Sequence, residues 1–280
     1  MLLPVARASG QSILPLAKHR EAVYNMDMSK TILIAGKNLP DGADFVDGAE
    51  VKMRSVAVTA PKGSKPASTP NTSAFEWTRT SPISARSLVL DAETEFGKID
   101  EAVLYFDESY YAGKFNLLTP QECSESIDEM ILGYQYLALE ILGRYEKKYS
   151  MGSGLEEEKA SAPKLAFLIK TCASECDVSK NGALRASTPM ASGPFVAAAA
   201  AAFKAFAENI AAIYGGREYV TVLLAQGDQN IEAAKRDRTL SEWICSYMDE
   251  VDKLKNKLTL KQSMNWIKAG AKGPGFSLFR

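Results

Sequence analysis

The sequence predicts an α/β fold in which a doubly wound parallel sheet, with helices on both faces, forms a single domain. Three observations support this prediction. Short apolar runs alternate with longer amphipathic stretches along the chain. The first apolar run, at 31–35, ends at a glycine, as a buried parallel strand does at a turn. The chain has 280 residues, 46% of them hydrophobic, which is enough for a large buried core.

The expected elements follow one another in the alternating order of such a sheet. Strands are expected at 31–35, 55–60, 74–78, 101–106, 164–169 and 219–225. Helices are expected at 84–96, 124–149, 194–214, 238–257 and 260–269, followed by a last apolar run at 276–279. Two stretches rich in proline, glycine and serine, 61–73 and 150–163, are expected to be mobile surface loops.

Residues 1–27 are expected to be a poorly ordered N-terminal extension ahead of a domain spanning 28–280, which opens with MSKTILIAG. An amphipathic targeting segment is the alternative, whereas a secretory signal is poorly supported because proline interrupts the apolar runs. The one histidine, His19, lies in this extension. The domain therefore has no imidazole for a catalytic triad or a zinc hydrolase site.

Composition excludes several other classes of function. The net charge of −1 gives no basic surface for nucleic acid or an anionic membrane. No apolar run approaches the roughly 18 residues that span a bilayer, so a soluble protein is expected. Four scattered cysteines form neither a disulfide framework nor a metal site, and they favour a reducing, cytoplasmic setting.

A glycine turn follows the first expected strand, and this is where doubly wound sheets bind phosphates. Gly36 and Gly42 have the outer spacing of a G-x-x-x-G-x-G turn, but Pro40 stands at the middle glycine position. The candidate binding residues around this turn are Gly36, Asn38, Gly42, Lys62 and Asp107.

Three phrases, in order, give the stretch from Lys30 to Gly227 a resemblance to the short-chain dehydrogenase/reductase (SDR) family, which has a Rossmann-like fold. They are SARSLVLDAETEFGKIDEAVLYFD, LTPQECSESIDEMILGYQYLALEIL and AFAENIAAIYGGREYVTVLLAQG. The resemblance implies NAD or NADP as cofactor and an Asn–Ser–Tyr–Lys catalytic set.

This chain departs from that set at every position. The asparagine position holds Met130, the serine position Lys170 or Thr171, and the Tyr-x-x-x-Lys pair Val196 and Ala200. (Ser174 lies further out, and a shift of one residue gives Phe195 and Ala199.) Neither valine nor alanine can donate a proton, so no catalytic residue of the family is present and its mechanism cannot operate.

The cofactor positions also depart from the family pattern. Pro40 removes a backbone N–H, and bulky residues at 104–107 stand where the family has a small, open Asn-Asn-Ala-Gly loop. Ala60 replaces the acidic residue of NAD enzymes, and Lys62 nearby favours NADP if any dinucleotide binds. Two hypotheses stay open: a binding or structural protein that has lost dehydrogenase chemistry, and a divergent NADP-dependent oxidoreductase.

Other candidates are weaker. Tyr110 and Lys114 have Tyr-x-x-x-Lys spacing, but Gly113 argues against the helix that would align them. Asp107 and Glu108 are candidate cleft residues, or simply a surface turn. Cys172 would need Lys170 to activate it, and a buried structural cysteine is the simpler interpretation.

The helices expected at 124–149 and 194–214 form the expected assembly surface. Six consecutive alanines at 197–202 place small side chains around the whole second helix, which permits close packing against a partner. The sequence therefore predicts a homodimer or homotetramer through these two helices.

Overall fold

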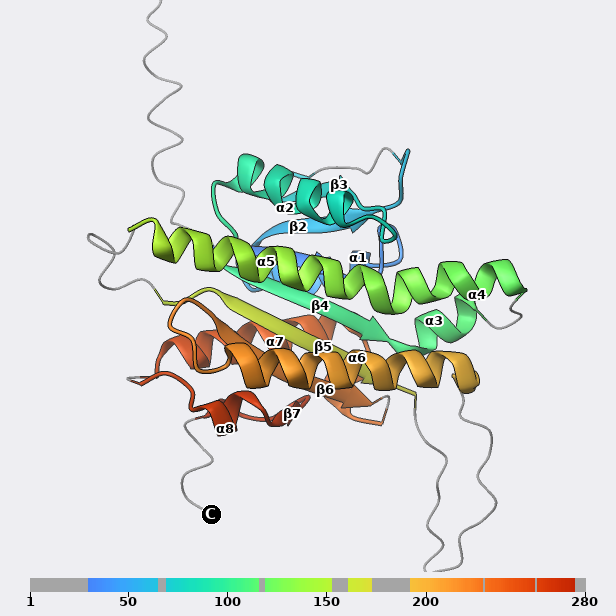
Figure 1. The fold of residues 1–280 in the computed structure, drawn as a ribbon. Coiled ribbons are helices and arrows are strands. Elements are labelled where there is room, and N and C mark those ends of the chain that lie inside the picture. The colour runs from blue at the N-terminus through green and yellow to red at the C-terminus, as the bar shows by residue number, and fades with distance from the viewer. Residues whose placement is uncertain are drawn as a thin grey trace, which may run out of the picture.

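The computed structural model describes residues 30–64, 69–115, 119–152, 161–172, 192–228, 230–254 and 256–274. Seven parallel strands form one sheet in the order β3-β2-β1-β4-β5-β6-β7 (Figure 1). The strands are β1 (Thr31–Ala35), β2 (Ser55–Ala60), β3 (Thr72–Glu76), β4 (Glu101–Asp107), β5 (Lys164–Thr171), β6 (Thr221–Asp228) and β7 (Trp266–Lys268). The predicted fold class is confirmed.

Helices cover both faces of this sheet. On one face lie α2 (Pro82–Phe96), α5 (Gly133–Ser150) and α6 (Gly193–Tyr214), and on the other lie α1 (Ala43–Val51) and α7 (Asp237–Asp252) (Figure 1). A hydrophobic core lies on each face of the sheet, and alternate residues of β4 contribute to each, because successive side chains of a strand point to opposite faces. Leu104 and Phe106 pack under the first group of helices, and Val103 and Tyr105 under the second.

The long helix expected at 124–149 begins earlier and is built in three parts. A capping box between Thr119 and Glu122 starts α4 (Pro120–Ile127), a π-helical turn η2 (Asp128–Leu132) follows, and α5 continues the path. The short helix α3 (Glu108–Lys114) contacts α6 and β5. It starts directly at the end of β4, so β4 and α3 have no loop between them.

The strand expected at 101–106 is confirmed and runs one residue further, so residues 104–107, aligned with the family's loop, are strand, because β4 pairs with β5 as far as Asp107 opposite Lys170. One predicted element is wrong. The helix expected at 260–269 is the single turn α8 (Leu260–Ser263) followed by β7, whose pairing with β6 satisfies backbone groups that would otherwise lie at the sheet edge. The short 3-10 turn η4 (Glu232–Ala234) precedes α7.

The alanine-rich helix α6 is long and apolar enough to cross a membrane by length and composition. In this fold it is a core helix, with Val196, Phe203, Ala207 and Ile210 buried on the sheet. The expected extension 1–27 and the run at 276–279 lie outside the described residues, as do parts of both expected loops, 65–68 and 153–160. The loop expected at 61–73 ends early, because β3 already starts at Thr72.

Candidate functional site

A cleft of about 870 Å³ opens at the carboxyl ends of the strands. It lies beside the point between β1 and β4 where the strand order reverses, which is where doubly wound sheets bind ligands. It is lined by the turn after β1, the segments that follow β2 and β3, helix α3, helix α4 and the turn η2. Its volume is in the range of small-molecule sites.

The glycines of the first turn are required by the fold itself. A Cβ on Gly36 would lie 2.3 Å from the Tyr105 carbonyl oxygen, and one on Gly42 would lie 2.5 Å from the Lys37 carbonyl oxygen. Both glycines therefore allow backbone segments to approach closely. They are explained without a ligand.

Backbone N–H groups of the same turn are committed within the protein. Leu39 donates to the Thr59 carbonyl at 3.0 Å, Gly42 to Asn38 at 3.1 Å and Ala43 to Pro40 at 3.0 Å. Pro40, joined to Leu39 by a cis peptide bond, has no N–H to offer. A phosphate at this turn would find few of the free donors that phosphate-binding loops present.

Charged side chains fill the space next to the turn. Lys37 Nζ lies 2.6 Å from Asp107 and 2.5 Å from Asp237, and Lys170 Nζ lies 2.8 Å from Asp237 and 3.9 Å from Asp107. The Tyr105 hydroxyl lies within hydrogen-bond distance of the same two carboxylates, at 3.1 and 2.9 Å, and can donate its one proton to either. We call these five residues the carboxyl-end cluster. It joins β1, β4 and β5 to the start of α7.

The carboxyl-end cluster is electrically balanced, with two lysines and two aspartates. Burial alone would raise the pKa of Asp237, but the charge of Lys37 and the hydrogen bonds from both lysines outweigh it and hold the pKa below its usual range. Burial would lower the pKa of Lys37, but Asp107 and Asp237 raise it above its usual value. Burial and both carboxylates raise the pKa of Tyr105. Lys37 and Asp237 are therefore charged at neutral pH, and Tyr105 is neutral.

Arg79, in the segment after β3, forms a wall of the cleft. Its guanidinium donates to the Tyr111 hydroxyl at 2.8 Å, to the Glu129 carbonyl at 2.9 Å and to the Gly36 carbonyl. It also lies over the Trp77 ring, 4.4 Å from the centroid. The arginine thus bridges the ends of β1 and β3 beside the glycine turn.

The positions that match the family's catalytic set hold core residues or residues that are paired within the protein. Met130 is fully buried in η2, and Val196 and Ala200 belong to the core under α6. Thr171 donates its hydroxyl to the Gly227 carbonyl at 3.3 Å, and Lys170 belongs to the carboxyl-end cluster. The shifted alternatives, Phe195 and Ala199, are also on α6, and Ser174 lies outside the described residues.

Tyr110 and Lys114 correct a sequence prediction, because both are in helix α3 despite Gly113. Capping by Asp107 explains this, since its carboxylate accepts from the backbone N–H of Ser109 and Tyr110. Lys114 lies 2.7 Å from Glu129, and burial raises the pKa of Tyr110 to about 12. This lysine is therefore paired with a carboxylate, and this tyrosine holds its proton at neutral pH.

Asp107, predicted to bind a cofactor, is 2% exposed and is not among the residues that line the cleft. Lys170 pairs with Asp237, so it is not free to activate Cys172. Burial raises the pKa of the Cys172 thiol, which lies 3.3 Å from the Ser109 hydroxyl. Burial also raises the pKa of Glu108, which accepts from the Cys172 backbone N–H. These groups form a structural contact between β5 and α3.

Of the predicted binding residues, Asn38 and Lys62 line the cleft. Sequence analysis missed three residues: Lys37, Arg79 and Asp237. Lys37 could have been found from its place directly after Gly36, because a side chain there projects at the ligand edge. Arg79 and Asp237 carry no local signal, since their roles depend on contacts across the fold.

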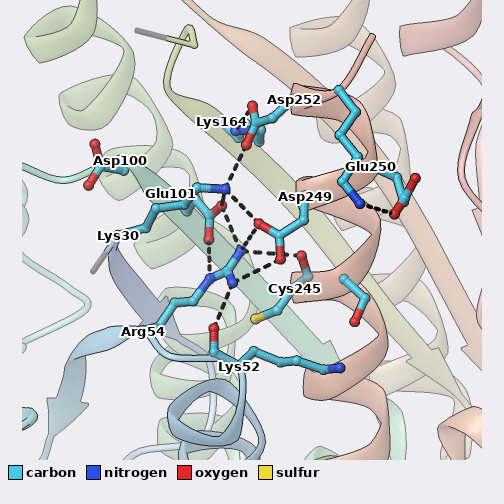
Figure 2. Close-up of polar contacts among 12 residues, drawn as sticks. Lys30, Lys52, Arg54, Asp100, Glu101, Lys164, Cys245, Asp249, Glu250 and Asp252 are labelled. Atoms are coloured by element: carbon cyan, nitrogen blue, oxygen red, sulfur yellow. Dashed lines mark hydrogen bonds and ion pairs between the residues drawn. The ribbon is translucent and has the colours of Figure 1, made fainter. Parts of the chain in front are cut away.

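A second buried charge cluster lies at the opposite end of the strands (Figure 2). Arg54 lies 3.1 Å from Glu101, which is fully buried, and 2.8 Å from Asp249 on α7. Lys30 pairs with Asp249 and Asp252, each at 2.6 Å, and Lys164 pairs with Asp252 at 2.6 Å. We call these six residues the amino-end cluster.

The three carboxylates of the amino-end cluster lie within 4.8 Å of one another, a spacing that could hold a metal ion. Each of them is already paired with lysine or arginine, as the dashed lines in Figure 2 show. Three cations therefore balance three anions, and the cluster is an ion-pair network that fixes α7 to the sheet.

Comparison with known proteins agrees with this architecture. No family model and no curated protein matches the sequence. A short-chain dehydrogenase from Mycobacterium smegmatis has a similar structure, with a TM-score of 0.55 and 9% identity over 88% of this chain and 93% of that one. A double mutant of a Serratia marcescens short-chain dehydrogenase/reductase gives a TM-score of 0.53 and 12% identity over 85% and 94%.

The fold and the cleft at its switch point define this chain as an α/β protein of the doubly wound class. The solved structures narrow that class: the chain has an SDR-like fold. The residues present do not fit the nicotinamide dinucleotide that this fold implies. The carboxyl-end cluster and Arg79 fill the region next to the glycine turn, and only the outer part of the site is open as a cleft among the described residues.

Proposed function

We propose that this protein is an SDR-like binding or structural component that has lost dehydrogenase chemistry. The observation that carries this proposal is the environment of Val196 and Ala200, which are 1% and 4% exposed in the core. No proton donor can act from either position, and neither side chain faces an open site. The family's reaction needs a hydroxyl and an ammonium there.

Weak binding of dinucleotides is part of the same proposal. A bound diphosphate would have to displace the Arg79 guanidinium from the Gly36 carbonyl and break ion pairs of Lys37. The first change would leave the buried Gly36 carbonyl without its donor, and the second would leave Asp107 and Asp237 short of a countercharge, which together cost several kcal/mol. Such a cost is large relative to the binding energy of a micromolar ligand, about 8 kcal/mol.

Calorimetric titration with NADH and NADPH tests the proposal. We expect no saturable binding of either below millimolar concentration, and no oxidation of NADPH in the presence of aldehydes or ketones. Binding that releases no net heat would escape calorimetry, so the melting temperature is also measured with each nucleotide and should stay unchanged. Micromolar binding together with carbonyl-dependent NADPH oxidation would overturn it.

One observation favours the second candidate, an NADP-dependent oxidoreductase. Lys62 follows β2 and lines the cleft, where it could meet a 2′-phosphate. For this candidate, Lys62→Gln should weaken NADPH binding but not NADH binding. Equal affinities of the wild type for both nucleotides would remove the basis for it.

Assembly is proposed through the outer faces of α5 and α6, which Figure 1 shows on the same side of the sheet. Leu139 on α5 is 50% exposed and Ile213 on α6 is 58% exposed, while Ala201 and Ala205 give α6 a low outer profile. A homodimer or homotetramer would bury these side chains. Ala205→Arg should then produce monomers in light scattering, whereas a monomeric wild type would refute the proposed interface.

A cytoplasmic location is also proposed, since the described cysteines Cys123, Cys172 and Cys245 are free.

A further inference from the structure

Charge is distributed unevenly along the chain. Residues 253–280 contain six lysines and one arginine but no aspartate or glutamate, although the whole chain has a net charge of −1. The net charge gave no indication of a basic surface, but it averages over the chain and conceals a local excess of one sign. The basic segment begins where α7 ends and includes α8 and β7.

Part of this basic segment lies where α5 and α6 end, at the end of the sheet away from the cleft (Figure 1). Lys257 donates from its ammonium group to the Glu218 carbonyl, and the Glu218 carboxylate accepts from the Tyr149 hydroxyl at 2.5 Å. The Tyr149 and Tyr219 ring centroids lie 5.9 Å apart, and α8 packs against α6. These contacts join residues 147–151, 217–219 and 257–264 into one continuous surface, which we call the helix-end surface.

Four large side chains with apolar bodies are exposed on the helix-end surface. Tyr149 is 53% exposed and Met151 is 75% exposed, both at the end of α5. Leu260 on α8 is 45% exposed, and Met264 directly after it is 43% exposed. A single exposed apolar side chain is ordinary, but several on one surface indicate a contact with another apolar medium or molecule.

Positive charge predominates on and beside the helix-end surface. Arg217 and Lys261 are exposed and make no ion pair within the part of the chain that the structure describes. Glu218, by contrast, is engaged by the Tyr149 hydroxyl. The charged side chains here are Lys147, Arg217, Lys257 and Lys261 against Glu146 and Glu218.

An anionic lipid surface matches both properties. Its headgroups attract lysine and arginine, and exposed apolar side chains are stabilised at the boundary between headgroups and acyl chains. Tyrosine favours this boundary because its ring is apolar and its hydroxyl is polar. A nucleic acid would attract the cations through its phosphates but would leave Met151 and Leu260 exposed to water.

We propose that the helix-end surface binds the anionic surface of a lipid bilayer, with Arg217 and Lys261 at the headgroups and Met151 and Met264 at the acyl boundary. This goes beyond the proposed function and does not depend on it, because the helix-end surface and the cleft lie at opposite ends of the sheet. A protein bound in this way keeps its cleft open to the solvent. The proposed cytoplasmic location agrees with this, since the cytoplasmic leaflet is anionic.

Co-sedimentation of the full chain with vesicles tests the proposal. One kind of vesicle has equal parts of phosphatidylcholine and phosphatidylserine, and the other has phosphatidylcholine alone. We expect binding to the first to be at least about tenfold tighter, because a neutral surface does not attract the cations. High salt should weaken binding to the anionic vesicles, because it screens the attraction between charges.

Two pairs of variants locate the binding surface. Arg217→Gln should weaken binding to anionic vesicles about fivefold, the effect of one charge near such a surface. Arg86→Gln is its matched control, since Arg86 is an exposed arginine near the start of α2, at the opposite end of the sheet. Met151→Gln should weaken binding about threefold by removing apolar surface. Ile83→Gln, on the first turn of α2, is the control for it, because Ile83 is 76% exposed and so matches Met151.

Equal sedimentation with both kinds of vesicle would overturn this inference, as would equal affinities of Arg217→Gln and Arg86→Gln. Tighter binding to duplex DNA than to anionic vesicles would assign the surface to nucleic acid and overturn it too. Dissociation of Arg217→Gln into monomers in light scattering, without vesicle binding by the wild type, would assign the surface to self-association instead. None of these results touches the proposed function, which the NADH and NADPH titrations decide without vesicles.

Discussion

The amino-end and carboxyl-end clusters place buried charges at the two ends of the same elements. Strands β1, β4 and β5 and helix α7 each contribute to both. Lys30 precedes β1 and Lys37 follows it, and Asp249 lies near the end of α7 while Asp237 starts it. The two networks thus fix the same helix to the same strands at opposite ends of the sheet.

They differ in what surrounds them. In the amino-end cluster, three cations balance three carboxylates at the end of the sheet away from the cleft (Figure 2). The carboxyl-end cluster lies at the ligand edge, and Lys37 belongs both to it and to the cleft wall. The first network therefore fixes α7 to the sheet at the end away from the cleft, whereas the second also shapes the wall of the cleft. Breaking each in turn separates these roles.

The largest effect is expected from Glu101→Gln. Glu101 is fully buried and accepts from two nitrogens of Arg54, at 3.1 Å each. Removing its charge leaves Arg54 underneutralised and should lower the free energy of unfolding by about 3 kcal/mol. Urea denaturation measures this. Glu250→Gln, which breaks the exposed pair with Lys253, is the control and should cost less than about 0.5 kcal/mol. Equal effects of the two would show that burial is not what makes the amino-end cluster matter.

Asp237→Asn should have the next largest effect. Its carboxylate pairs with Lys37 and Lys170 and accepts from Tyr105, so the substitution leaves two buried lysines with Asp107 alone. We expect a loss of about 2 kcal/mol in the same urea measurement, less than for Glu101 because Asp237 is slightly exposed. A loss below about 0.5 kcal/mol would mean that the carboxyl-end cluster contributes little to stability.

Much of the fold could be predicted from the sequence, because apolar runs report directly on buried strands. The run at 31–35 became β1 without change, and the helix at 84–96 differs from α2 by two residues. Errors arose where tertiary contacts decide. The extension of β4 to Asp107 depends on pairing with β5, and β7 depends on the edge of β6.

The candidate site was less predictable for the same reason. Asn38 and Lys62 follow strands, and position along the chain alone places them at the cleft. Asp107 was placed at the correct edge of the sheet, and in the structure its carboxylate contacts Lys37 and caps helix α3, two contacts that its local sequence does not indicate. No local sequence pattern indicates that Asp237 contacts Lys37 at the end of β1, 200 residues away in the sequence.

Acid should weaken both clusters. The pKa values of Asp237 and Asp249 are depressed in the folded state, because the neighbouring lysines and arginine outweigh the opposing effect of burial. Each carboxylate therefore contributes stability that is complete above its unfolded pKa, about 3.9, and is lost as pH falls through the lower folded value. Unfolding free energy should decline below about pH 4. Asp237→Asn and Asp249→Asn should each show a shallower decline than the wild type, and parallel curves would contradict this assignment.

The smallest effects separate the two lysines that flank β1. Lys37→Gln leaves Asp107 and Asp237 to share Lys170, and with 14% of its side chain exposed we expect a loss of about 1 kcal/mol. Lys30→Gln leaves Asp249 with Arg54, and the side chain of Lys30 is 31% exposed, so the loss should stay below about 0.5 kcal/mol.

The same pair of variants also differs in acid. Loss of the Lys37 charge should raise the pKa of Asp237 toward its ordinary value, so Lys37→Gln should lose part of the stability that the wild type gains between low pH and neutrality. Lys30→Gln should keep most of that gain, because Arg54 still depresses the pKa of Asp249. Urea titrations of both variants at pH 7 and pH 3.5 measure the contrast. A larger loss from Lys30→Gln at neutral pH would reverse the comparison and make the amino-end lysine, rather than the one at the cleft, the critical charge beside β1.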